Sequence, residues 1–532
     1  MLEKPGRRQG LLVVAAAALL CVGLWTSWRY TIGAWRSDPD IFVTVQLWKG
    51  VREFGPGFVR TWIYTQDNWL FSLIPFTSAF FELFGASLKT AVMPGWLIFV
   101  GSVALTAALV WRLAGWRAAL TTACVLIFGG LHALGGAGYL AYPISHNLSM
   151  AWALLALVLA LDAVERQAYA PALAAAAAVF INVASDPWAA VAIAGPLVAA
   201  GGGLAVLNRK DRLGRVAAVL AIGAAVALLL AQTRLFGLLS FLPKSHFALA
   251  DFATMRLNIG WAQRALGHMF NVVPGADLKA TAPRLISATA AVAAIGAAMA
   301  VTALGLLRAS PGRQLVGATA VLSIAGVMAI YVVGSFPPAL AVGRFFPQVY
   351  YLGALLIALV AADHWSRWRW PLKAGLAGYA VLFMLAGLLS APALWLQPQK
   401  PGENPAAAAL AQALEARGLS YGYGVFWGTH SLVMDTITQG RVTIRPVSFM
   451  SGRVRQRPAQ TSSLWYAPQA EPHGDPRRFL VIVDDGEECP DVEACVRIAE
   501  RQFGPASDRF QHGEAVVLVW PRPVAQLIDK VN

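Results

Sequence analysis

The sequence has few charged residues and few cysteines. Only 13% of its 532 residues are Asp, Glu, Lys or Arg, whereas 57% are hydrophobic. Soluble globular domains are about 25% charged and about 45–50% apolar. Four cysteines are too few for a disulfide scaffold, and no Gly/Ser, Gln/Asn or Pro repeat indicates a disordered or fibrous protein. The composition therefore predicts a polytopic membrane protein.

Compact catalytic motifs are also missing. The sequence has no Gly-rich nucleotide-binding loop, no HExxH, no CxxC and no GxSxG. The net charge of +14 does not indicate a nucleic-acid partner, because residues 397–532 hold 14 basic and 15 acidic residues and the surplus lies in residues 1–396. Basic residues beside apolar segments normally fix the orientation of membrane spans. Without a basic stripe interleaved with aromatics, nucleic acid is not expected to bind.

Eleven segments are long and apolar enough to cross a hydrocarbon core of about 30 Å as helices. They are residues 11–28, 88–111, 118–135, 147–163, 170–185, 187–207, 215–235, 285–307, 314–333, 345–362 and 373–395. The first is expected to be retained rather than cleaved. No small-residue cleavage site follows it, and Trp25, Trp28 and Tyr30 suit an interfacial belt.

The charge of the short loops predicts the orientation of the chain. Positive charge stays in the cytoplasm, and with a cytoplasmic N-terminus the basic turns near residues 4–8, 112–117, 166, 209–215, 308–313 and 367–373 all fall inside. Two long outer loops, 29–87 and 237–284, alternate apolar and polar residues in a way that suits interfacial helices. The apolar run 70–86 contains Pro75 and Glu82, and we expect a juxtamembrane helix there rather than a span.

Residues 397–532 are predicted to form a soluble α/β domain outside the membrane, and residues 1–396 the membrane module. After a Pro-rich linker, we expect a helix over 406–418 and strands near 421–426, 441–446, 479–483 and 515–520. Cys489 and Cys495 lie in this domain, where an oxidising space would let them pair.

The strongest candidate site is the segment Arg36-Ser37-Asp38-Pro39-Asp40, just beyond the first span. Two carboxylates there could hold a divalent cation such as Mg or Mn, or take a proton from an attacking hydroxyl. The alternative is a solvated turn in which an Asp caps a helix that starts near Ile41.

Further polar residues recur at the outer ends of the predicted spans. They are Asp67, His146, Asn147, Asp186 and Arg344. Each alone could cap a helix or extend toward the membrane surface. Their common side favours a catalytic cavity at the outer leaflet, because a transport path would leave polar residues in the middle of spans.

Several sequence motifs occur in an order known from one family. SDPDIFVTVQLWKG and FGPGF are followed by YTQDNWLFSLIPFTSAFFELFGAS, YPISHNLSMAWALLALVLALDA, GRFFPQVYYL and GLSYGYGVFWGTHSLVMDTITQGRVTIRPV. The chain thereby resembles the GT-C superfamily of integral-membrane glycosyltransferases, in particular the bacterial branch similar to protein O-mannosyltransferases and the aminoarabinose transferase of lipid A. It departs from that pattern at Ser185-Asp186, where relatives carry a Lys.

The resemblance implies a fold of about eleven spans with an extracytoplasmic C-terminal α/β domain, in the inner membrane of a bacterium. It implies a polyprenyl-phosphate sugar as donor, a lipid, glycan or protein as acceptor, and inversion at the anomeric carbon. The rival interpretations are a transporter or lipid flippase, and a scaffold whose soluble domain binds a partner.

The resemblance also implies roles for individual residues. Asp38 or Asp40 would be the general base or a metal ligand, and Arg344 would face the donor phosphate. Lys244 and His246 in the second long loop are further candidates for the phosphate or the cavity. The residues expected to line the cavity or contact the acceptor are Asp67, His146, Asn147 and Asp186.

Overall fold

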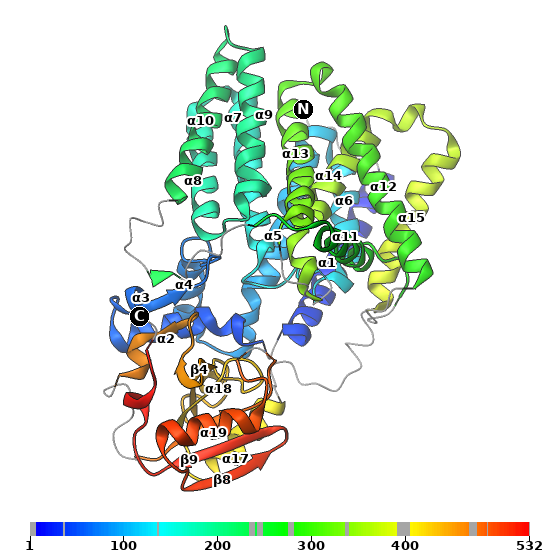
Figure 1. Ribbon diagram of the computed structural model, residues 1–532. Helices are drawn as coiled ribbons and strands as arrows, with labels where there is room; N and C mark the ends of the chain where they lie inside the picture. Colours follow the sequence, from blue (N-terminus) through cyan, green and yellow to red (C-terminus); the bar gives the residue numbers. More distant parts are fainter. Residues whose placement is uncertain are drawn as a thin grey trace. The chain divides into compact units, whose positions relative to one another are not determined.

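Figure 1 shows the computed structural model of the chain, which describes residues 7–35, 38–135, 138–232, 240–241, 248–274, 281–335, 340–390, 405–467, 476–486 and 488–530. The chain forms two compact units, each built from segments far apart in sequence. The first comprises Met1–Ala34, Met93–Thr233 and Ser245–Pro398, and the second comprises Trp35–Val92, Arg234–Lys244 and Gln399–Asn532. The functional division proposed at residue 397 stays a prediction.

The first unit is helical. Within the described residues, eight helices are long and apolar enough to cross a membrane, judged by length and composition. They are α5 (Leu88–Ala114), α7 (His146–Arg166), α9 (Gly195–Leu207) with the π-helix η3 (Ala190–Ala194) before it, α10 (Arg212–Gln232), α12 (Ala282–Gly305), α13 (Pro311–Val333), α14 (Pro347–His364) and α15 (Trp370–Ser390). The other three predicted spans coincide with α1 (Arg7–Trp35), α6 (Trp116–Gly129) and α8 (Tyr169–Ser185).

Small residues allow these helices to pack closely. Helices α8 and α10 lie side by side (Figure 1), and a Cβ added at Gly223 would lie 2.8 Å from the Cβ of Ala176. Helices α6 and α15 approach still more closely, since a Cβ at Gly387 would lie 1.8 Å from the carbonyl oxygen of Phe128. In lipid, where apolar burial gives no driving force between helices, such close contacts hold a bundle together.

A turn between α8 and α9 places a carboxylate among the helices. Asp186 has extended backbone, with φ −144° and ψ 111°, which is the conformation that a following proline favours. After Pro187 the chain re-enters helix as η3. The hydroxyl of Ser323 on α13 donates a hydrogen bond to the carbonyl of Ala192, so the wider π turn is tied to a neighbouring helix.

Ion pairs join helices at the end of the unit where α5, α7 and α14 finish. Arg112 on α5 pairs with Asp162 at 3.2 Å and with Glu165 at 2.5 Å, both on α7. Arg313 near the start of α13 pairs with Asp363 on α14 and donates to the carbonyl of Leu113 at 2.6 Å. Several basic residues predicted to face the cytoplasm therefore have acidic partners.

The second unit contains a six-stranded sheet in the order β5-β4-β3-β7-β9-β8. Strands β4 and β7 flank β3 in parallel, and the other pairs are antiparallel. The strands are β3 (Tyr421–Val425), β4 (Thr443–Met450), β5 (Arg453–Gln456), β7 (Arg478–Ile482), β8 (Asp508–His512) and β9 (Ala515–Trp520). Helices α17 (Pro405–Glu415), α18 (Met434–Ile437) and α19 (Val492–Phe503) accompany the sheet.

All four predicted strands and the helix before them are confirmed. Cys489 and Cys495 form a disulfide, as their place in this domain indicates. The fold class is therefore that of a polytopic α-helical membrane protein with a C-terminal α/β domain.

The first long loop contributes short helices to the second unit. They are the 3₁₀-helix η1 (Pro39–Phe42), α2 (Val43–Phe54), α3 (Phe58–Thr61) and α4 (Ile74–Phe84). With 11 residues α4 is too short to cross a bilayer, which needs about 20, so the expectation that this run is not a span is confirmed. Glu82 on α4 accepts hydrogen bonds from Trp48 and Arg52 on α2, at 2.8 Å and 2.9 Å.

A second, three-stranded sheet joins distant segments within the same unit. Strand β1 (Trp62–Tyr64) lies between β2 (Ser240–Phe241), with which it is parallel, and β6 (Thr461–Ser462), with which it is antiparallel. The first long loop therefore pairs with the C-terminal region through β1 and β6, and the second long loop joins the same sheet by pairing with β1. The second loop also contains α11 (Phe252–Met269), which belongs to the first unit.

Candidate functional site

The acidic segment forms the start of a helical element. Asp38 is the N-cap of η1, and its Oδ1 accepts a hydrogen bond from the backbone N–H of Asp40 at 3.0 Å. Pro39 occupies the first helical position, where its missing N–H is tolerated. Both carboxylates are half-buried. The capping role considered from sequence is thus confirmed for Asp38, although the element begins at Pro39 rather than near Ile41.

The residues around Asp38 and Asp40 supply few further ligands for a metal ion. Arg36 and Ser37 lie outside the described residues. In the described part of the chain no group of three or more His, Cys, Asp or Glu side chains converges, and two carboxylates alone give a cation few of the oxygen ligands it needs. The Mg or Mn site at Asp38 and Asp40 stays a prediction, and no chemical step below is routed through a metal.

Asp67 lies in the second unit, in the turn before α4. Its backbone carbonyl accepts a hydrogen bond from the Thr65 hydroxyl at 3.0 Å, and its side chain is half-buried. The next residue, Asn68, accepts from the backbone N–H of Leu70 at 2.9 Å. Asp67 therefore belongs to a hydrogen-bonded turn, in the same unit as Asp38 and Asp40.

A buried polar cluster lies in the first unit, where α7 begins and α8 ends. Asp186 Oδ2 is 2.7 Å from Nδ1 of His146 and also accepts from the hydroxyl of Ser149. Asp186 Oδ1 accepts from the backbone N–H of Trp188 at 2.9 Å. Asp186 is 1% exposed and His146 8% exposed. The Asp186 carboxylate is therefore held in place by Ser149 and the Trp188 backbone, with the His146 imidazole against it.

The other ring nitrogen of His146, Nε2, has a different environment. Nδ1 faces the Asp186 carboxylate, whereas Nε2 makes no hydrogen bond to the described residues. The imidazole lies between two aromatic rings, with its centroid 5.4 Å from that of Trp188 and 4.9 Å from that of Phe345. Asp186 and the two rings thus hold the imidazole in one orientation.

Arg344 joins this cluster through Phe345. Its guanidinium lies 5.1 Å from the ring centroid of Phe345, on the 3₁₀-helix η6 (Leu340–Phe345), and its side chain is exposed. Tyr331, near the end of α13, contacts Phe345 with centroids 5.6 Å apart. One aromatic ring therefore separates an exposed guanidinium from a buried histidine.

Asn147 supports the loop that precedes α7. It is fully buried, and its amide nitrogen donates to the carbonyl of Leu140. Its amide oxygen has no hydrogen-bond partner among the described residues, and the same holds for the amide oxygen of Asn182 on α8. Buried amide oxygens are normally satisfied, so these two are exceptions to the rule within the described residues.

The predicted site residues fall into three groups. His146, Asn147, Asp186 and Arg344 gather at one end of the helices of the first unit. Asp38, Asp40 and Asp67 belong to the second unit. Lys244 and His246 lie outside the described residues.

Sequence reasoning missed the residues that complete the cluster. Ser149 follows His146 by one helical turn, and Asn182, which donates to the Ser149 carbonyl at 2.8 Å, precedes Asp186 by one turn. The i, i+3 and i, i+4 spacings put such residues on one helix face, so this signal was available. The contact of Phe345 with His146 joins segments about 200 residues apart, and no local pattern indicates it.

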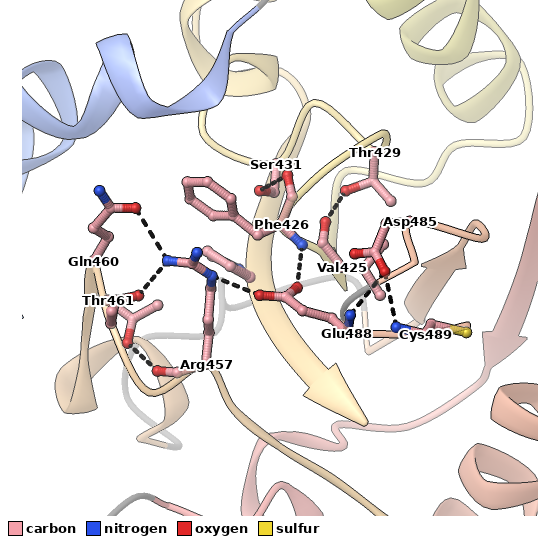
Figure 2. Close-up of polar contacts among 12 residues, drawn as sticks. Val425, Phe426, Thr429, Ser431, Arg457, Gln460, Thr461, Asp485, Glu488 and Cys489 are labelled. Carbon is pink, nitrogen blue, oxygen red and sulfur yellow. Dashed lines mark hydrogen bonds and ion pairs between the residues drawn. The ribbon is translucent and has the colours of Figure 1, made fainter. Parts of the chain in front are cut away.

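A half-buried ion pair lies at the end of β3 in the six-stranded sheet. Figure 2 shows Glu488 between the guanidinium of Arg457, whose Nε is 2.6 Å from Glu488 Oε1, and the backbone N–H of Phe426, which donates to Oε2 at 2.7 Å. Arg457 also donates to Gln460 at 3.0 Å and covers the Phe426 ring. Burial raises the pKa of Glu488 even though Arg457 opposes the shift. The hydrogen bonds of this pair go to the chain itself, as expected of a structural brace.

Comparison with known proteins gives structural neighbours only. No family model matches the sequence, and no curated protein matches it. The chain is similar to an oligosaccharyltransferase of Archaeoglobus fulgidus, solved with Zn and sulfate, over 91% of this chain and 71% of that one, with a TM-score of 0.48 and 14% identity. It is similar to ArnT of Cupriavidus metallidurans, solved with undecaprenyl phosphate, over 96% and 98% of the two chains, with a TM-score of 0.48 and 11% identity.

A third neighbour is the arabinosyltransferase EmbB of Mycobacterium smegmatis, matched over 65% of this chain and 30% of that one, with a TM-score of 0.36 and 15% identity. These neighbours are proteins of the kind that the sequence resemblance predicts. Similarity at this level assigns neither a substrate nor a residue role to the chain.

Proposed function

We propose that this chain is a membrane glycosyltransferase that moves a sugar from a polyprenyl-phosphate donor to an acceptor hydroxyl at the outer face of the membrane. The observation that carries the proposal is the gathering of His146, Asp186 and Arg344 at one end of the helices of the first unit. Ionisable groups at membrane depth are costly and usually mark a site. A site at helix ends suits a lipid whose reacting headgroup lies at the membrane surface, whereas a transport path should have polar groups in mid-span.

The proposed reaction is a single displacement with inversion. The acceptor oxygen attacks the anomeric carbon and forms a C–O bond there, while the bond from that carbon to the phosphate oxygen breaks. The polyprenyl phosphate leaves with the bonding electron pair, and the proton of the acceptor hydroxyl passes to a carboxylate, the role that the resemblance implies for Asp38 or Asp40. Negative charge grows on the leaving phosphate, and the exposed guanidinium of Arg344 can donate two parallel hydrogen bonds to it.

His146 and Asp186 would serve the sugar or the acceptor rather than the phosphate. Because Asp186 holds Nδ1, the imidazole offers Nε2 to a ligand hydroxyl in a fixed direction. Asn147 keeps the cavity role that the resemblance implies. Asp67, Lys244 and His246 keep the cavity or phosphate roles that the resemblance implies.

The proposal is tested by transfer of radiolabel from a panel of undecaprenyl-phosphate sugars to endogenous membrane acceptors. Purified native protein is compared with Asp38→Asn and Asp40→Asn. Asn is as good an N-cap as Asp, so Asp38→Asn removes the base and preserves the start of η1. We expect one of the two variants to lose about 10²- to 10⁴-fold in rate, which is the usual contribution of a general base.

The matched control is Asp363→Asn, which removes a carboxylate from the ion pairs at the opposite end of the helices. It should keep the native rate. Absence of transfer and of donor hydrolysis with every donor, from protein shown to be folded, would contradict the proposal. Solute or lipid uptake by sealed vesicles under those conditions would favour a transporter.

A further inference from the structure

Helix α2 is attached to the C-terminal domain by a buried polar network. The amide of Gln46 donates to Asp435 Oδ1 at 2.7 Å and to the carbonyl of Leu432 at 2.9 Å, and its oxygen accepts from Arg445 at 3.2 Å. Lys49, one turn further along α2, lies 3.2 Å from Asp435 Oδ2. Gln46, Asp435 and Arg445 are at least nine-tenths buried. These contacts join residues nearly 400 positions apart within one compact unit.

A second attachment lies beyond α2. The hydroxyls of Thr61 and Ser462 are 2.7 Å apart, next to the pairing of β1 with β6. The backbone N–H of Gln460 donates to the carbonyl of Ile63 at 2.8 Å. The rings of Trp62 and Trp465 meet edge to face with centroids 5.2 Å apart. The segment that follows Asp38 and Asp40 therefore contacts the C-terminal domain at two places, first through residues 46–49 and again through residues 61–63.

The network constrains where α2 can lie. If Gln46 were displaced, Asp435 and Arg445 would lose hydrogen bonds made in a buried environment, and a buried charge that loses a partner is strongly unfavourable. Hydrogen bonds also depend on the direction of approach, whereas apolar contacts do not, so they restrict the orientation of α2. Since α2 begins at Val43, directly after η1, the orientation of α2 also sets that of Asp38 and Asp40.

We propose that the C-terminal α/β domain is a positioning clamp for the acidic segment, with Gln46, Asp435 and Arg445 as its positioning residues. The inference rests on the proposed function, because it assigns the acidic segment a catalytic geometry that must be maintained. It gives the C-terminal domain a role in the reaction without contact with the reacting atoms. It also explains why polar residues, rather than apolar ones, fill this interface.

The first test uses Asp435→Asn, which keeps the shape of the side chain and removes its charge, and Gln46→Leu. Two readouts are taken: steady-state label transfer, and deuterium exchange of a peptide covering residues 38–54. We expect kcat to fall at least tenfold with the donor KM within about twofold of native, and faster exchange in that peptide. Arg441→Gln, which breaks an exposed ion pair with Glu415 in the same domain, should change neither readout.

A disulfide crosslink tests whether Asp435→Asn acts through the position of the acidic segment or through a general loss of folding. Thr61→Cys and Ser462→Cys place two thiols where two hydroxyls touch, in an Asp435→Asn chain that also carries Cys21→Ala and Cys124→Ala. Oxidation should restore slow exchange and most of kcat, and a reductant should reverse both. The Asp435→Asn chain without the new cysteines receives the same reductant, to account for Cys489–Cys495.

Each result decides between the proposals. Unchanged exchange and kcat in Asp435→Asn, or a verified crosslink that restores neither, would overturn the clamp. If native protein transfers no sugar, the proposed function fails, and the clamp as a positioning device for catalysis fails with it. If native protein is active and exchange in the 38–54 peptide rises while kcat stays native, the clamp alone is overturned.

Discussion

The two ends of the helices in the first unit hold their charges in different ways. Where α7 ends, Arg112 meets two carboxylates, and its side chain and that of Glu165 are 27% and 41% exposed. Where α7 begins, His146 meets one carboxylate, and the side chains of His146 and Asp186 are 10% and 1% exposed. The first arrangement is solvated and has a spare acidic partner. The second is buried, and its one carboxylate also contacts Ser149 and the backbone of Trp188.

This difference in exposure indicates at which end of the helices the charged side chains serve a functional site. An exposed ion pair costs little to form and contributes about 0–1 kcal/mol. A buried pair loses hydration energy that is comparable to the attraction it gains, so its presence is not explained by stability. We infer that the basic turns at one end serve orientation and that the buried pair at the other end serves a site.

The largest effect is expected for Asp186→Ala. This change leaves the His146 imidazole, the Ser149 hydroxyl and the Trp188 N–H without their acceptor. Removing one partner of a buried pair costs about 3–5 kcal/mol, so the free energy of unfolding in detergent should fall by that amount. Denaturant titration followed by tryptophan fluorescence measures it. A loss below about 1 kcal/mol would show that the pair is not buried as described.

His146→Gln should have an intermediate effect. The amide of Gln can still donate to Asp186, but it cannot stack between Trp188 and Phe345. Aromatic contacts of this kind contribute about 0.5–1.5 kcal/mol each, and we expect a loss of about 1–3 kcal/mol. Label transfer should fall by more than the change in stability explains. A variant with native transfer would remove His146 from the proposed cavity.

Arg112→Gln should have the smallest effect, below about 1 kcal/mol. The remaining charge pairs at that end are partly solvated, so adding 0.5 M salt should shrink even this difference, because salt screens exposed charges. The same titration, repeated at two salt concentrations, checks it. A loss comparable to that of Asp186→Ala would abolish the contrast between the two ends.

Local sequence patterns were sufficient for most of the fold. Long apolar runs predicted the helices, and short β-type runs predicted β3, β4, β7 and β9. The short strands β1 and β2 were missed because two or three residues carry no period and form only when distant segments meet. Helix α6 ends at Gly129, before the predicted end at residue 135, because hydropathy does not distinguish a helix from the apolar turn that follows.

The candidate site was only partly predictable. His146 and Asp186 were singled out separately, and their contact follows from two antiparallel helices joined by a short turn. The network of Gln46 with Asp435 and Arg445 could not be found from sequence, since its members are nearly 400 residues apart and each is an ordinary surface residue type. Asp38 was predictable as a residue of interest, but spacing alone could not separate its cap from a catalytic role.

The central claim is that phosphate-linked sugar chemistry takes place at the end where α7 begins, and two arginines test it most directly. Arg344→Gln removes the exposed guanidinium beside Phe345, and Arg313→Gln removes one from the opposite end. Label transfer from undecaprenyl-phosphate sugars should fall at least tenfold in Arg344→Gln and stay within about twofold of native in Arg313→Gln. Equal rates in the two variants would contradict the account.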